Sequence, residues 1–284
     1  MSSALVVARF ALRESLRRRV FAIVAVLTLA FLALYGLGAR AVFRSLDGGL
    51  VGEALVEEDV VAGATMLGLG CFATLFLGAV LAVFLTLGAV RGDAERGLLQ
   101  PVLVRGVSRG SYLLGRWLGA AGICAPYVMV VFVLAAAITH AVGGWWPDRT
   151  LGPALGLAFG VTVIAALSVF ASVALSTAAN GIAVFMIFGA GLVAGLLGQI
   201  AEGLQSATLA EVAEVASWAL PFEALYQEAL AGLTADTVGF SRLAIDLGPF
   251  GGAAPGGPGL WLYALAYLSV VVAAARWLFA RRDL

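Results

Sequence analysis

The residues best suited to contact a partner protein are concentrated between positions 91 and 116. This stretch carries both signs of charge, several glycines and a Leu- and Val-rich middle, which favours a compact loop that docks on a soluble protein. A solvated loop that serves only to fix membrane topology is the alternative interpretation. The residues that we predict to couple the chain to such a partner are Arg91, Asp93, Glu95, Gly97, Ser108 and Arg109.

A second candidate surface follows from helical spacing after position 221. Apolar residues recur there at i, i+3, i+4, i+7 and i+8, which is typical of an amphipathic helix, and Pro221 suits a helix start. The first three apolar positions, Phe222, Leu225 and Tyr226, are predicted to form a gate or docking surface. A lid that only packs on neighbouring helices is the alternative.

The polar residues around this helix are expected to face away from the protein. Glu223 and Glu228 lie on its polar side. A preceding helix is predicted over residues 208–220, with apolar residues inward and acidic residues outward. Its inward residues are Leu209, Val212 and Val215, and its outward residues are Glu211 and Glu214.

Nucleotide hydrolysis by this chain is excluded because all 17 basic residues are arginine. The phosphate-binding loop G-x-x-x-x-G-K-[ST] requires a lysine, so any ATP-driven step must use ATP and Mg²⁺ held by a partner. The apolar stretches contain no carboxylate pair, metal-ligand cluster or Ser–His pair. We therefore expect a protein that is not an enzyme and holds no cofactor or metal of its own.

The composition requires a membrane. Of the 284 residues, 62% are hydrophobic and 12% are charged, whereas a soluble domain has about 45–50% apolar and about 25% charged residues. An ordinary soluble fold and a nucleic-acid-binding protein are both excluded by this balance. A membrane-spanning helix needs about 20 apolar residues, and several stretches of this chain reach that length.

Six spans result when the longest apolar stretches are divided at their polar or Gly- and Pro-rich breaks, which lie at 176–181 and 248–259. The predicted fold is all-α, a single polytopic membrane domain over 1–284. The spans are 20–39, 60–90, 118–146, 151–175, 182–200 and 260–279. Their central parts contain no ionisable residue, which argues against an ion-coupled carrier.

The arginines set the orientation. Thirteen lie on the face that holds both termini and the 91–117 loop, and four lie opposite, so the positive-inside rule predicts that both termini are cytoplasmic. The segment 201–259 is then extracytoplasmic. Residues 1–19 are predicted to form an amphipathic helix that binds anionic membrane lipids, and a simple charge cluster that sets topology is the alternative.

The loop resembles a motif of the ABC-2 permease family, the membrane subunits of type-2 ABC exporters. The family pattern is an acidic residue, x, Gly-Thr, an apolar run, Pro-x-x-Arg and an apolar stretch ending in Gly-Lys. The matching positions are Glu95, Gly97, Leu99, Ser108, Arg109, Leu113, Leu114, Gly115 and Arg116. Leu98, Gly106 and Arg116 stand where the family usually has Thr, Pro and Lys.

This resemblance implies a permease subunit in a bacterial cell (inner) membrane, working in export with a dimer of ATPase subunits and a second permease copy or a similar chain. The subgroup it resembles most includes the permease that serves nitrous oxide reductase maturation. An extracytoplasmic accessory protein is a further expected partner. The alternative function is a membrane scaffold that transmits ATPase motion to an outer protein without translocating a small molecule.

Two Gly-x-x-x-Gly motifs permit close helix approach. They begin at Gly156 and at Gly191. Each either marks a dimer interface or reflects the high glycine content of the chain.

Overall fold

The computed structural model describes residues 5–10, 19–47, 58–95, 97, 107–238, 241 and 256–281. Within these residues the chain is helical and contains no strand. The helices are α2 (Arg19–Asp47), α3 (Glu58–Thr86), α4 (Arg91–Glu95), α6 (Arg109–Gly143), α7 (Leu151–Ala174), α8 (Thr177–Leu204), α9 (Ala207–Ala219), α10 (Pro221–Leu233) and α12 (Gly257–Ala280). Residues 5–10 are also helical.

The prediction of six long apolar helices is confirmed, because α2, α3, α6, α7, α8 and α12 are each long and apolar enough to cross a membrane. Several boundaries differ from the predicted ones. Helix α6 begins at Arg109 because the Ser108 hydroxyl caps it, accepting a hydrogen bond from the Ser111 amide. Helix α12 begins at Gly257 because Pro258, in the first turn, needs no amide hydrogen there.

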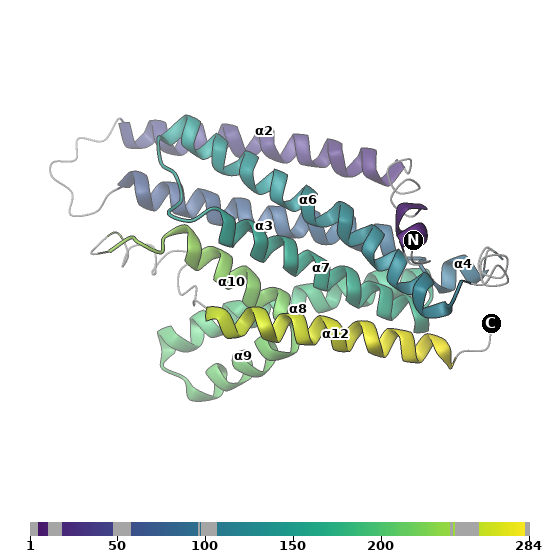
Figure 1. The fold of residues 1–284 in the computed structure, drawn as a ribbon. Coiled ribbons are helices and arrows are strands. Elements are labelled where there is room, and N and C mark those ends of the chain that lie inside the picture. The colour runs from purple at the N-terminus through teal and green to yellow at the C-terminus, as the bar shows by residue number, and fades with distance from the viewer. Residues whose placement is uncertain are drawn as a thin grey trace.

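The six long helices lie side by side in one bundle (Figure 1). Helices α3 and α7 form its centre. In the most apolar 18-residue stretch of each, 67% of the residues are buried, compared with 17% in α2. Helix α7 is apolar all round, as a central helix must be. The peripheral helices α2, α8 and α12 turn large aliphatic side chains outward, which suits contact with lipid.

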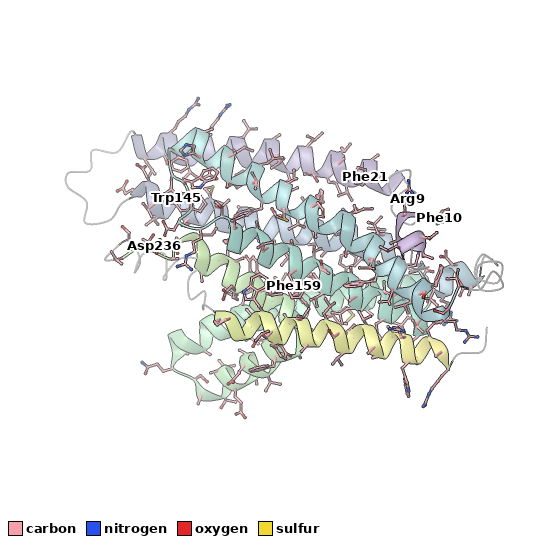
Figure 2. The ribbon with its side chains drawn as sticks, viewed as in Figure 1. Arg9, Phe10, Phe21, Trp145, Phe159 and Asp236 are labelled. Atoms are coloured by element: carbon pink, nitrogen blue, oxygen red, sulfur yellow. The ribbon has the colours of Figure 1, made fainter. Side chains whose placement is uncertain are left out.

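The bundle has two distinct ends, named here the α4 end and the α9 end. Helix α4, residues 5–10, the α7–α8 connection and the end of α12 lie at the α4 end (Figure 1). The α6–α7 connection, the α8–α9 turn and the start of α12 lie at the α9 end. Figure 2 shows Arg9 and Phe10 at the first end, and Trp145 and Asp236 at the second.

Helices α9 and α10 form a hairpin that folds back into the bundle (Figure 1). The first residues of α10 pack on the middle of α8, where a Cβ atom on Gly191 would lie 2.6 Å from the Phe222 ring. Gly191 precedes Leu204, the last residue of α8, by 13 residues, which corresponds to about 20 Å along a helix. The hairpin tip therefore reaches the depth of the membrane-spanning helices.

Both Gly-x-x-x-Gly motifs accommodate α10. A Cβ on Gly156 would lie 3.1 Å from the Leu225 carbonyl oxygen, and a Cβ on Gly160 would lie 3.5 Å from that of Phe222. The second motif lies on α8, and its two glycines face side chains of α10. The glycine faces are thus occupied by α10 within the chain, which argues against the dimer interface that was one of the two alternatives.

The predicted inward face of α9 is wrong for its two valines, although Glu211 and Glu214 are exposed as predicted. Val212 and Val215 are 52% and 65% exposed, and Ala213 is buried instead. A Cβ on Gly198 of α8 would lie 3.7 Å from the Ala213 Cβ, so small residues make the contact between the two helices. The larger valines face outward because this close approach leaves them no room.

Candidate coupling site

The predicted coupling segment starts as a continuation of α3. A tight turn joins α3 to α4, in which the Asp93 amide donates to the Gly88 carbonyl at 3.1 Å and the Ala94 amide to the Val90 carbonyl at 2.9 Å. Gly97 has a φ of +68°, a conformation that glycine adopts without strain. Arg96 and residues 98–106, which carry part of the family motif, lie outside the described residues.

Asp93 lies at the centre of a buried polar cluster. Its Oδ2 atom accepts a hydrogen bond from the Tyr112 hydroxyl at 2.6 Å and lies 3.4 Å from the Arg116 Nη2 atom. The Tyr112 hydroxyl is also 3.1 Å from the Ala89 carbonyl oxygen. Asp93 and Arg116 are each 9% exposed. This cluster fixes α4 to the start of α6, so Asp93 acts through its neighbours and not as a surface contact.

Arg91 joins α4 to α7. Its Nη1 atom donates to the carbonyl of Ala174, the last residue of α7, at 3.2 Å, and its Nε atom pairs with Glu95 Oε1 at 3.1 Å. A cation at a helix C-terminus is favoured by the partial negative charge there. The Arg91 and Glu95 side chains are 42% and 58% exposed, so both also remain open to a partner.

Arg109 makes the equivalent contact with α12. Its Nη1 atom donates to the carbonyls of Phe279 and Ala280, at 3.2 Å and 3.3 Å, and its guanidinium carbon lies 5.8 Å from the centre of the Phe279 ring. Two predicted coupling arginines therefore hold the ends of two long helices that are remote in sequence. Ser108 positions Arg109 by capping α6.

A third connection, made by Asn180, was not predicted from the sequence. This residue is fully buried near the start of α8. Its Nδ2 atom donates to the Leu87 carbonyl after α3 and to the Ser168 carbonyl of α7, both at 3.1 Å. Asn180 lies in the polar break at 176–181 that separates two predicted spans, and spacing along the chain does not identify its hydrogen-bond partners.

Together these contacts join α4 to the ends of α3, α6 and α7, and Arg109 adds α12 at the start of α6. A force applied to α4 would therefore reach four membrane-spanning helices through buried or half-buried polar contacts. Among the described side chains, no three His, Cys, Asp or Glu residues are grouped as a metal site would require. The site is suited to mechanical contact rather than to bond chemistry.

The second predicted surface lies in the protein core. Phe222 and Leu225 are fully buried and Tyr226 is 5% exposed, among residues of α3, α7 and α8. The predicted amphipathic helix is present and its apolar face is covered by the other helices. A docking role would require α10 to move so that this face becomes exposed. A gating role would not require an exposed face. Both roles remain predictions.

Glu223 does not face outward as predicted. It is 3% exposed, and its Oε1 atom accepts a hydrogen bond from Gln227 Nε2 at 2.8 Å. Burial raises the pKa of the Glu223 carboxyl above its ordinary value, and the Gln227 hydrogen bond partly opposes that rise. An ionisable residue therefore does lie among the membrane-spanning helices, carried there by the hairpin and not by a span.

The sequence model of a family described as ABC-2 family transporter protein matches residues 5–284, nearly the whole chain. No curated protein matches the chain.

Proposed function

The chain belongs to the ABC-2 family of transporter proteins, so it is the permease subunit of an ABC transporter, and we propose that it works in export, driven by separate ATPase subunits. The observation that carries this proposal is the arrangement of Arg91, Asp93 and Arg109, which connects one short element to the ends of several spans. Closure of an ATPase pair on ATP would push α4, tilt the attached helices and open a path toward the α9 end.

The proposed assembly contains two ATPase subunits and two permeases, either two copies of this chain or this chain and a similar one. ATP and Mg²⁺ belong to the ATPase subunits. Membrane lipids surround the peripheral helices, and an accessory protein at the α9 end is a further partner. Within the family, we place the chain beside the permease that serves nitrous oxide reductase maturation, because of the resemblance in architecture over the whole chain.

The proposed orientation puts the α4 end in the cytoplasm of a bacterial cell, with both termini there and the α9 end outside. The arginine distribution supports it. Single cysteines at Glu95 and Asp236, both exposed positions, test it in a chain that lacks Cys71 and Cys124. In intact cells an impermeant thiol reagent should label only the cysteine at 236, and labelling at 95 instead would reverse the orientation.

Charge reversal tests the coupling role. Glu95→Arg and Arg109→Glu should each lower transport-stimulated ATP hydrolysis about twofold to fivefold, because a half-exposed charge contact contributes roughly 0.5–1 kcal/mol. The measurement is ATP hydrolysis and co-purification of the ATPase subunit in reconstituted membranes. Arg149→Glu, an exposed change at the α9 end, is the matched control. Full coupling in both α4-end variants would mean that the ATPase binds elsewhere.

A further inference from the structure

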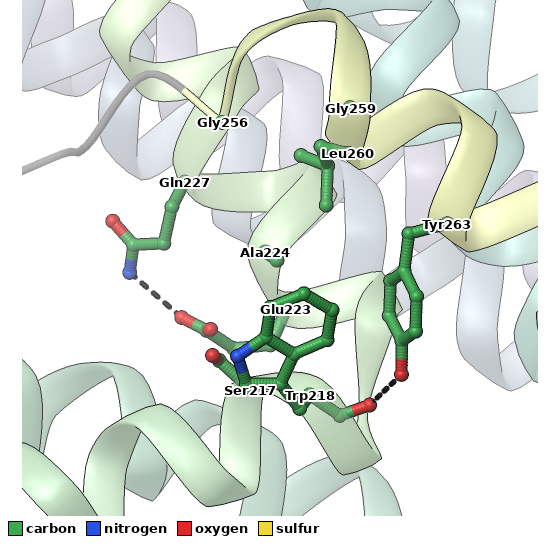
Figure 3. A pocket seen from close by; sticks show the side chains of 9 residues that line it. All are labelled: Ser217, Trp218, Glu223, Ala224, Gln227, Gly256, Gly259, Leu260 and Tyr263. Carbon is green, nitrogen blue, oxygen red and sulfur yellow. Dashed lines mark hydrogen bonds between the residues drawn. The ribbon is translucent and has the colours of Figure 1, made fainter.

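A cavity of about 460 Å³ opens between α9, α10 and α12 at the α9 end. Figure 3 shows its lining, in which Trp218 and Ser217 come from α9, Glu223 and Gln227 from α10, and Leu260 and Tyr263 from α12. The cavity therefore lies where the hairpin meets the last span. None of these residues belongs to the coupling site.

The polar groups of the cavity are mainly hydrogen-bond acceptors. The Glu223 carboxylate is buried, and the Gln227 Oε1 atom is buried without a hydrogen-bond partner in the described part of the chain. The hydroxyl hydrogens of Ser217 and Tyr263 are already donated to the backbone carbonyls of Glu214 and Trp218. A bound group that donates hydrogen bonds or carries positive charge would complement this lining.

The segment that carries the cavity is acidic in sequence. Between positions 202 and 259 it has seven acidic residues and one basic residue, Arg242. Over the residues that the structure describes, no arginine forms a salt bridge with Glu223. Burial favours the protonated form of an acid that has no cationic partner, and a bound cation would instead hold Glu223 as the carboxylate.

Two aromatic rings form one wall of the cavity. The Trp218 and Tyr263 rings meet edge to face with their centres 4.7 Å apart, and the Tyr263 hydroxyl bonds the Trp218 carbonyl, which fixes their relative position. Aromatic faces attract ammonium groups, and Trp attracts them most strongly. The combination of two rings and one carboxylate is suited to an organic ammonium ion.

An inorganic cation fits less well. Calcium takes six to eight oxygen ligands and magnesium requires octahedral oxygen coordination. The carboxylate of Glu223 and the Oε1 atom of Gln227 supply few such oxygens, and the opposite wall is aromatic. An anion is disfavoured by the same carboxylate.

The outer face of α9 indicates what the rest of the ligand is like. Val212, Val215 and Trp218 are exposed on it, and Trp218 also lines the cavity. A hydrocarbon chain attached to an ammonium group would lie along these side chains at the membrane boundary. The exposed apolar stripe and the cavity are therefore continuous at Trp218.

We propose that this cavity binds the ammonium group of a cationic amphiphile, with Glu223 as its counter-ion, Gln227 as a second acceptor and the Trp218 and Tyr263 rings as its aromatic wall. The ammonium group belongs either to a lipid headgroup or to a free amine. The inference deepens the proposed function and rests on it, since a permease that exports such a molecule would hold it here near the outer opening.

The test is binding of radiolabelled benzylammonium, whose N–H groups can donate to Glu223 and Gln227, to the full-length chain in nanodiscs of phosphatidylglycerol, which carries no ammonium group. Binding should be saturable in the wild type and at least about tenfold weaker in Glu223→Gln, which keeps the shape and removes the charge. Glu211→Gln, an exposed acid on α9, is the matched control and should bind as the wild type does. Trp218→Leu removes only a half-exposed ring and should also weaken binding severalfold if the aromatic wall contributes.

Equal binding by the wild type and by Glu223→Gln would overturn the proposal, and so would equal competition by ethylbenzene, the uncharged carbon analogue. Nanodiscs containing phosphatidylethanolamine separate the two sources. A weaker apparent affinity for the probe there identifies a lipid headgroup, and an unchanged affinity identifies a free amine. Because no ATPase is present, a failure of this binding is distinct from a failure of ATPase coupling.

Discussion

The two ends of the bundle bury charge in different ways. At the α4 end, the Asp93 carboxylate is paired with Arg116 and bonded by Tyr112. At the α9 end, the equally buried Glu223 carboxylate has only the neutral Gln227 amide as its bonded partner among the described residues. The first carboxylate is paired with a cation within the chain, whereas the second has no cation beside it among the described residues. We therefore interpret the first buried acid as structural and the second as part of the proposed ligand site.

The largest expected effect is at the α4 end. Asp93→Asn keeps the shape of the side chain but removes the charge that faces the buried Arg116. Breaking a buried ion pair from one side costs about 3–5 kcal/mol, and this variant should lose about that much unfolding free energy in detergent. Glu95→Gln, in the exposed pair with Arg91, is the control and should change stability by no more than about 1 kcal/mol. Equal stability of the two variants would show that the Asp93 cluster does not hold α4 in place.

The next effect concerns the glycine contact of α8 with α10. A Cβ on Gly195 would lie 2.0 Å from Glu223 Oε1 and 2.8 Å from Gln227 Nε2, so Gly195→Ala must displace both side chains. The displaced groups are the ends of flexible side chains, so the cost should lie at the low end of the about 1–3 kcal/mol that is typical of overpacking, and the displacement should also weaken binding of the ammonium probe. Gly189→Ala, on the same helix with open space around it, should be neutral or stabilising by up to about 1 kcal/mol. Thermal unfolding of both variants in the same detergent makes the comparison, and a Gly195→Ala protein as stable and as able to bind as the wild type would refute the close contact.

A smaller effect is expected at Asn180. Asn180→Ala leaves the Leu87 and Ser168 carbonyls without their amide donor at the α4 end, which should cost about 1–3 kcal/mol or less, depending on whether water replaces the donor. Hydrogen exchange should rise at the amides around the α3–α4 turn more than at those of α10. Uniform exchange throughout the bundle would mean that Asn180 does not join α3, α7 and α8.

The parts of the fold that could be predicted from the sequence are those that depend on local pattern. Long apolar stretches predicted six helices, and the spacing from Phe222 to Leu230, with Pro221 ahead of it, predicted α10 and its buried face. Neither pattern shows against which other helices a predicted helix packs. The glycine motifs predicted a close helix contact but not that α10 would be the helix in contact.

The functional residues were likewise predictable only as far as local pattern reaches. Charge density located the coupling segment, yet whether a charge faces inward depends on residues far away in sequence, such as Ala174 for Arg91 and Phe279 for Arg109. Glu223 was placed on the polar side of its helix because helical spacing assumes that one face meets water. The fold-back of the hairpin removes that condition, since α8 and α12 cover both sides of α10 at this depth.

The smallest effect on stability is expected for Glu223→Gln, and it bears most directly on the comparison of the two ends. Neutralising an acid that no arginine of the described chain pairs with removes a desolvation cost and retains a bond from the Gln227 amide, so unfolding free energy should change by less than about 1 kcal/mol or increase. Asp93→Asn removes the same charge from a similarly buried carboxylate and should destabilise by severalfold more. Measured side by side by denaturant unfolding, the two isosteric changes separate a charge held for the fold from a charge held for a ligand. A large loss for Glu223→Gln would mean that its charge has a partner within the protein, and the two ends would then be alike.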